Sequence, residues 1–196
     1  MTKFAILLAG AALLAGCQTN PTPPPMPPVA VDPNNPLFAP GFMAAAASGG
    51  QFEIQSSQLA LQMSQNAAVR NFANMMIADH SRLNQALAAA ATSAGLTPPA
   101  PVLMPAEQAM LDQLRATPPG PAFDLAYKNA QISGHQQALQ LMQNYAASGD
   151  VPALRNAAAQ AVPVVQMHLQ QAQMLPVEPA AAPLPPMTPG QRGERG

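Results

Sequence analysis

The chain has 196 residues, of which only 9% are charged, against roughly 25% in an ordinary soluble domain. Eight Lys and Arg residues balance nine Asp and Glu residues without any run of like charge, so the sequence offers no basic surface for nucleic acid. The sequence also contains no phosphate-binding glycine loop and no nucleophile motif, so we do not expect an enzyme.

The N-terminal residues predict export and lipid attachment. Lys3 precedes the apolar run FAILLAGAALLAG, whose 13 residues are too few to span a bilayer but suit the core of a signal peptide over residues 1–16. The end of this run, LAGC, resembles the lipobox of bacterial lipoproteins, which implies a diacylglyceryl thioether on Cys17, the single Cys of the chain. The alternative is an uncleaved core helix that buries the thiol. Because Gln18 and not Asp follows Cys17, the resemblance favours the outer membrane.

Two Pro-rich segments frame the expected domain. Residues 17–40 comprise the lipidated Cys and a linker in which Pro is too frequent for helix or sheet, so a polyproline II spacer is expected. Residues 176–196 are similarly rich in Pro and Gly, and we expect a disordered tail. Residues 41–175 between them are predicted to form one domain.

Apolar residues recur at helical spacing through this domain, which predicts four long helices and one short helix. Asn66 is expected to cap the second long helix, and Gly95 to end it. Pro105 opens the short helix and Pro121 the third long helix. Asp150 is expected to cap the fourth. The inward stripes run from Phe42 to Met63, Val69 to Ala90, Phe123 to Tyr145 and Leu154 to Leu175.

The joints between the first two and the last two long helices are short, so these helices are expected to form two antiparallel hairpins. Residues 95–120 can span about 40 to 60 Å, enough to cross the whole bundle. The expected fold is therefore all-α, a ferritin-like four-helix bundle with a long crossover that carries the short helix between the second and third long helices.

Four polar residues from four helices are expected in one layer near the middle of the bundle. Counting about 1.5 Å per residue from the helix joints places Glu53, His80 and His135 at similar heights, with His168 within roughly 10 Å of them. Asp79 neighbours His80 but points about 100° away from it, so it reaches a facing helix or solvent. We therefore expect Asp79 to act as an outer partner of the cluster.

Several stretches resemble one family of exported bacterial proteins. FMAAAASGGQFEIQSSQLALQMSQNAAVRNFANMMIADHSRLN, FDLAYKNAQISGHQQALQLMQNYAASGD and AVPVVQMHLQQAQML are similar to the family called domain of unknown function 4142, over about residues 42–175. The resemblance implies a ferritin-like four-helix fold. It implies no activity, because none is assigned to the family and fold alone does not give function. The residues that carry it are Gly49, Gly50, Glu53, Asp79, His80, His135, Pro163 and His168.

Metal binding and a structural polar layer are two alternative interpretations of the cluster. A di-iron site needs Glu-x-x-His on two helices, whereas Ile77 and Val165 stand three residues before His80 and His168, so ferroxidase chemistry is not expected. Three imidazoles and a carboxylate can still hold one Cu or Zn ion. Alternatively, they can simply hydrogen-bond each other. The candidate ligands are Glu53, His80, His135 and His168, with Met75, Met76, Met142 and Met167 as nearby sulfur donors.

Pro163 falls inside the fourth long helix, where it removes the hydrogen bond to the carbonyl of Ala159. One interpretation is a bend in the helix axis, which also exposes a backbone acceptor near the cluster. The other is that VPVV divides the helix into two segments.

The sequence thus predicts a lipid-anchored protein of the bacterial cell envelope, facing the periplasm, whose bundle binds a Cu or Zn ion or serves in envelope stress. The alternative is a structural or interaction lipoprotein that docks to an envelope protein and whose Glu and His layer only stabilises the bundle. Both predictions make the membrane a partner through the lipid, and neither involves nucleic acid.

Overall fold

The structure is a computed structural model that describes residue 32 and residues 34–177. These residues form α1 (Ala39–Met63), α2 (Ala67–Ser93), α3 (Pro105–Ala116), α4 (Pro121–Ser148) and α5 (Pro152–Met174), and the described ranges contain no β-strand. The predicted signal peptide, Cys17, most of the linker and the tail beyond residue 177 lie outside the described residues.

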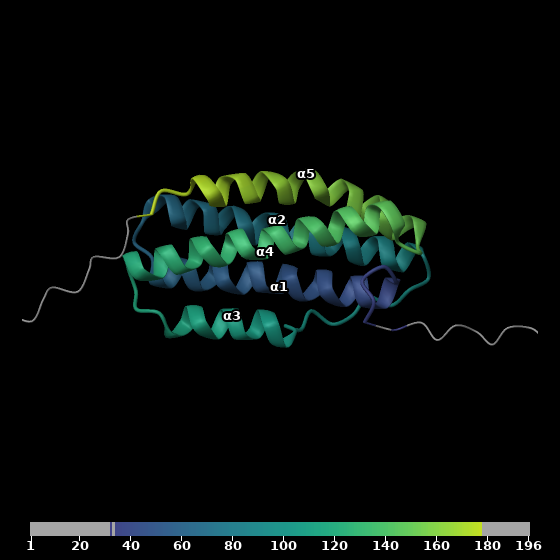
Figure 1. The fold of residues 1–196 in the computed structure, drawn as a ribbon, viewed down its shortest axis with the longest axis horizontal. Coiled ribbons are helices and arrows are strands. Elements are labelled where there is room, and N and C mark those ends of the chain that lie inside the picture. The colour runs from purple at the N-terminus through teal and green to yellow at the C-terminus, as the bar shows by residue number, and fades with distance from the viewer. Residues whose placement is uncertain (1–31, 33, 178–196) are drawn as a thin grey trace, which may run out of the picture. The chain divides into compact units, whose positions relative to one another are not determined.

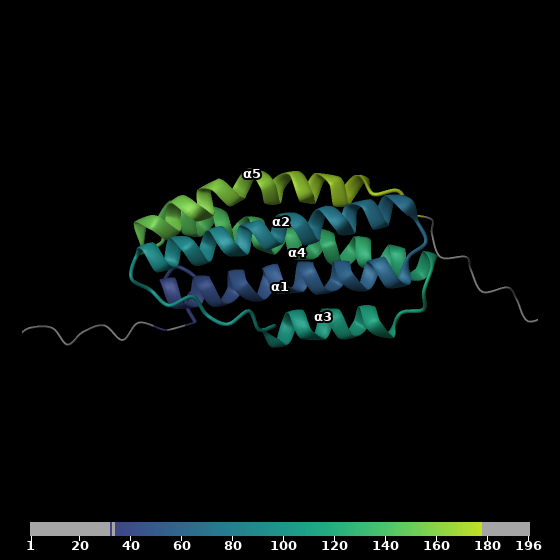
Figure 2. The ribbon, with the colours of Figure 1, turned by 180° about the vertical axis from the view of Figure 1, so that it is seen from behind.

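The four long helices form two antiparallel hairpins, α1 with α2 and α4 with α5, packed with α1 against α4 and α2 against α5 (Figure 1). The end of α2 lies beside the start of α1, where Ala91 and Ala39 share a hydrophobic cluster. The other end of the crossover is fixed at the end of α1, because Gly120 donates its backbone N–H to the carbonyl of Met63 at 3.1 Å. The crossover therefore runs the length of α1, and α3 packs along it (Figure 2). The predicted all-α four-helix bundle is confirmed.

Two helix starts differ from the sequence prediction. α1 begins at Ala39, two residues before the expected domain boundary, next to a Pro at its first turn. The predicted cap of α5 by Asp150 is wrong: Val151 occupies the N-cap position and Pro152 the first helical position. Asp150 instead accepts a hydrogen bond from the Tyr145 hydroxyl at 2.8 Å, which holds its carboxylate on α4.

Pro163 lies within an uninterrupted α5, so the two-segment alternative is excluded. Its ring is exposed, and the buried residues Ala161 and Val165 lie on either side of it in the sequence. The proline therefore faces away from the bundle core. None of the described helices is long and apolar enough to cross a membrane.

Asn66 caps α2 as predicted, since its side chain accepts a hydrogen bond from the Ala68 N–H at 2.9 Å. Gly95 follows the end of α2 with a φ of 73°, a left-handed conformation that favours glycine.

Asn66→Ala should lower the free energy of unfolding by about 1 kcal/mol, because the Ala68 N–H loses its partner at the helix start. Urea unfolding followed by circular dichroism would measure this change. Asn74→Ala, on the exposed face of the same helix, is the matched control and should change the stability much less.

Candidate metal centre

Three histidines on three helices converge in the middle of the bundle. His80 on α2, His135 on α4 and His168 on α5 are all buried, and one ring nitrogen from each lies within 4.8 Å of the others. The ring centroids are 5.3 to 5.4 Å apart. The sequence therefore predicted this convergence of the three imidazoles correctly.

Hydrogen bonds to the outer nitrogens of two imidazoles orient them. Nδ1 of His135 donates to the backbone carbonyl of Gln131, one turn earlier on α4, at 2.8 Å. Nε2 of His168 donates to Oδ2 of Asp79 on α2 at 3.1 Å. These acceptors fix the protons on Nδ1 of His135 and Nε2 of His168, so the other nitrogen of each ring carries a lone pair. Asp79 is also paired with Arg82 at 2.6 Å.

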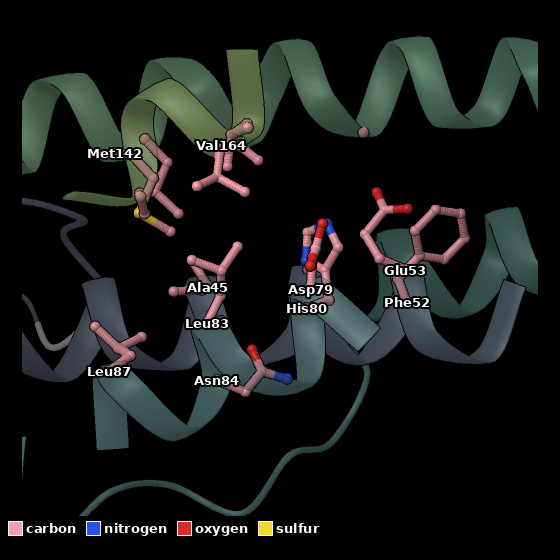
Figure 3. Close-up of a pocket in the computed structure, with 18 of the residues that line it drawn as sticks. Ala45, Phe52, Glu53, Asp79, His80, Leu83, Asn84, Leu87, Met142 and Val164 are labelled. Atoms are coloured by element: carbon pink, nitrogen blue, oxygen red, sulfur yellow. The ribbon is translucent and has the colours of Figure 1, made fainter. Parts of the chain in front are cut away.

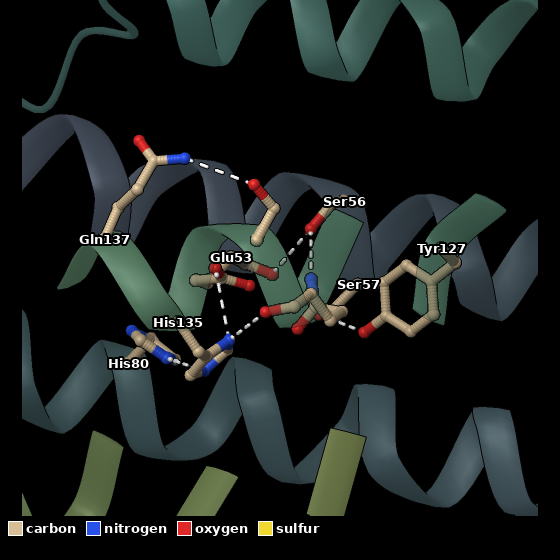
Figure 4. A network of polar contacts seen from close by, with 9 residues as sticks. Glu53, Ser56, Ser57, His80, Tyr127, His135 and Gln137 are labelled. Carbon is tan, nitrogen blue, oxygen red and sulfur yellow. Dashed lines mark hydrogen bonds and ion pairs between the residues drawn. The ribbon is translucent and has the colours of Figure 1, made fainter. Parts of the chain in front are cut away.

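The lone pairs on Nε2 of His135 and Nδ1 of His168 are not fully satisfied by hydrogen bonds within the described residues. Nδ1 of His168 is buried and has no hydrogen-bond partner among the described residues. Nε2 of His135 meets Nε2 of His80 at 3.4 Å (Figure 4). That separation is about the spacing of two imidazole nitrogens at a tetrahedral metal ion with bonds of roughly 2.0 to 2.1 Å. The chemistry and spacing of this pair therefore fit a metal ion.

All three imidazoles are held in the neutral form. Burial lowers the pKa of His135 to about 4, although the hydrogen bond to Gln131 opposes the shift. Burial also lowers the pKa of His80 well below its ordinary value, and the neighbouring imidazoles add to this. The pKa of His168 is lowered by burial, with Asp79 acting in the opposite direction. Neutral imidazole is the form that binds metals, so no proton has to leave at neutral pH.

Glu53 on α1 lies beside the three imidazoles, on the Nδ1 side of His135. Its Oε1 is 3.6 Å from Nδ1 of His135, whereas His80 approaches the same ring at Nε2. Burial raises the pKa of Glu53 to about 8, and a hydrogen bond from the Gln131 side chain opposes the shift. Gly134 makes room for the carboxyl group, because a Cβ at this position would lie 2.7 Å from Oε1 of Glu53.

The structure thus brings His80, His135 and His168 together, and it places Asp79 against His168 as an outer partner, on a facing helix as expected. Glu53 does not lie within the group of converging ring nitrogens. Its role as a direct ligand stays a prediction. Of the methionines considered as sulfur donors, Met75 and Met76 belong to the hydrophobic cluster that contains Phe72 and Tyr127. Met142 and Met167 line a cavity that His80 also borders.

The polar residues that support the cluster from α1 and α4 were not predicted from the sequence. Gln131 donates from its side-chain amide to Oγ of Ser56 at 3.1 Å, in addition to accepting from His135 (Figure 4). Ser57 and Tyr127 share a further hydrogen bond of 2.7 Å. The available signal was spacing: Gln131 precedes His135 by four residues and so shares its helix face.

Comparison with protein families matches residues 24–175 to the family described as Domain of unknown function (DUF4142). This match covers most of the chain, and the protein therefore belongs to that family. A search among curated proteins gives no match. Among solved structures, one described as "CopM in the Cu(II)-bound form" is similar, with a TM-score of 0.57 and 18% sequence identity. The similarity covers 70% of this chain and 94% of that chain, and it shows a shared fold.

Proposed function

We propose that this DUF4142 protein binds one copper or zinc ion through His80, His135 and His168. The observation that carries the proposal is the convergence of three buried, neutral imidazoles, one of which has an unpartnered Nδ1 among the described residues. A buried nitrogen without a partner costs about 1 to 3 kcal/mol, and a metal ion would use its lone pair. The proposed role is binding and not catalysis.

Copper is the favoured ion in this proposal. Imidazole ligands suit both copper and zinc, so the three histidines alone do not choose between them. The solved structure with a similar fold is described as Cu(II)-bound, which supports copper. Asp79, by accepting from His168, would make that ring more basic and fix its orientation.

The alternative, a polar layer that only stabilises the bundle, requires that its members satisfy one another. Besides Nδ1 of His168, the buried atoms Oε2 of Glu53 and Oε1 of Gln131 have no hydrogen-bond partner within the described part of the chain. Because buried polar atoms in a structural network are nearly always paired, this layer is incomplete as a network. The incompleteness favours the binding hypothesis.

Equilibrium dialysis of chelator-stripped protein, made without a His tag, should show one Cu²⁺ or Zn²⁺ bound per chain. Asp79→Ala should weaken the affinity by about tenfold or more, because the outer partner of His168 is lost. Gln143→Leu, a change on the exposed face of α4, is the control and should bind as the wild type does. Absence of binding to the wild type would refute the proposal.

We also propose that the protein is attached to the bacterial envelope by a lipid on Cys17 and faces the periplasm from the outer membrane. This part rests on the sequence alone, namely the short apolar run, the LAGC stretch and the single Cys. Radiolabelled palmitate should enter the wild-type protein, and Cys17→Ser should prevent the labelling. Label in the Cys17→Ser variant, or none in the wild type, would contradict the lipoprotein assignment.

A further inference from the structure

A cavity of about 610 Å³ lies beside the imidazoles, bounded by α1, α2, α4 and α5 with a contribution from α3. It separates the two hydrophobic clusters of the bundle, one built around Phe72 and Tyr127 and the other around Phe42 and Tyr145. Figure 3 shows Leu83, Met142 and Val164 facing this space, with Glu53, Asp79 and His80 at one end of it.

Small residues on α1 explain why the core is open here. Ala45, Ala46 and Gly49 line the cavity where larger side chains would otherwise fill the bundle. A Cβ on Gly49 would find no atom within 4 Å. On the opposite wall Leu83 and Leu141, which the sequence stripes place inward, are only half-buried and line the cavity.

One end of the cavity carries a buried carboxyl group. Glu53 is 3% exposed and lines the cavity, and its Oε1 lies beside Gly134, which lines the cavity as well. A molecule in the cavity could therefore hydrogen-bond to the Glu53 carboxyl group and bury its own apolar body against the walls. Pockets of about 300 to 1,000 Å³ that combine apolar walls with a few polar groups are typical of small-molecule sites.

We propose that the cavity binds a small apolar molecule with one neutral oxygen-bearing head, a hydroxyl or carbonyl group, which hydrogen-bonds to Glu53. The walls contribute burial of apolar surface, and the head forms a hydrogen bond with the Glu53 carboxyl group. This site is separate from the proposed metal centre, although His80 borders both, and it does not depend on a bound metal.

The charges around the cavity favour a neutral head over an ionised one. A carboxylate head would have to leave water for a cavity whose walls are mostly apolar. The guanidinium of Arg82 also lines the cavity, but it is 74% exposed and paired with Asp79. An ammonium head would also lose its hydration, and the carboxylate of Asp79 beside His80 is already paired with Arg82 and His168.

The test uses the full-length protein in chelator, so that metal plays no part. N-phenyl-1-naphthylamine, a neutral dye that fluoresces in apolar surroundings, should bind the wild type and be displaced by 1-dodecanol and 2-dodecanone. Dodecanoate and dodecyltrimethylammonium should displace it at least about tenfold more weakly, because their charged heads would have to leave water without gaining a partner.

Gly49→Leu and Ala138→Leu place a larger side chain in the cavity from α1 and α4, and each should abolish dye binding. Ala89→Leu, on the exposed face of α2, is the matched control and should bind as the wild type does. Circular dichroism establishes that each variant is folded.

Dye binding that survives in both folded cavity variants would overturn the cavity site. Equal displacement by dodecanol and dodecanoate would overturn the assignment of a neutral head at Glu53. Because metal is absent throughout, neither result bears on the metal proposal, and a failure to bind Cu²⁺ leaves the cavity result unchanged.

Discussion

Saturating the metal-free protein with Cu²⁺ should raise its melting temperature by roughly 5 to 10 °C, and His80→Leu should abolish the rise. A ligand that binds only the folded state at about one hundred times its Kd adds roughly 2.7 kcal/mol to the free energy of unfolding. For a domain of this size, each kcal/mol corresponds to about 2 to 4 °C. Thermal melts of both proteins in chelator and in excess metal would measure the effect.

The metal-free form of His80→Leu should be about as stable as the metal-free wild type. The hydrogen bond found for the His80 ring within the described residues is the 3.4 Å contact with His135, so few partners lose anything. Leu also exchanges a buried polar ring for an apolar side chain. If the layer instead were a closed network, metal would leave the melting temperature unchanged and His80→Leu would cost about 1 to 3 kcal/mol. That pair of results would refute the metal proposal.

The sequence predicted the meeting of the histidines because helical geometry carries that information. A rise of about 1.5 Å per residue sets the height of His80, His135 and His168, and their positions on the inward stripes set their direction. The long crossover followed from the length of residues 95–120. The N-cap of α2 followed from Asn66, because the preference for Asn at this position is local and strong.

Other features depend on how the helices pack, which spacing does not contain. The stripes predicted Leu83 as core, but this residue faces a cavity because Ala45 and Gly49 line its other wall. The position of Glu53 on the Nδ1 side of His135 follows from the absence of a side chain at Gly134. Asp150 was a reasonable cap by residue type, and the Tyr145 hydroxyl binds it instead. In the first two cases packing between helices decided the outcome, and in the third a hydrogen bond from α4 to the joint that follows it did so.

The stability of the metal-free protein should be greatest near pH 6.5 and should fall on both sides. Below that pH the histidines of the unfolded chain bind protons, whereas the buried histidines of the folded chain do not. Burial lowers the pKa of His135 from 6.5 to about 4. Stability then rises with pH from 4 to 6.5, by about 3 kcal/mol for this residue. The pKa values of His80 and His168 are lowered too and act in the same direction.

Glu53 makes the stability depend on pH in the opposite direction. Its pKa is raised by burial from 4.5 to about 8, so between these values the folded state holds a proton that the unfolded state has lost. Stability therefore falls as pH rises through this window. Between pH 4.5 and 6.5 the histidines oppose the fall. Above pH 6.5 Glu53 acts alone, and the loss should reach about 2 kcal/mol by pH 8.

Glu53→Gln should remove the fall above pH 6.5 and keep the rise below it, because the amide fills the same place and does not titrate. Urea unfolding of the wild type and of Glu53→Gln in chelator, at intervals from pH 4 to 8.5, would measure both limbs. A fall that persists in Glu53→Gln would assign it to another acid. A wild-type profile that is flat from pH 6.5 to 8 would mean that Glu53 is ionised inside the folded bundle, and a carboxylate beside three imidazoles would then be available as the fourth metal ligand.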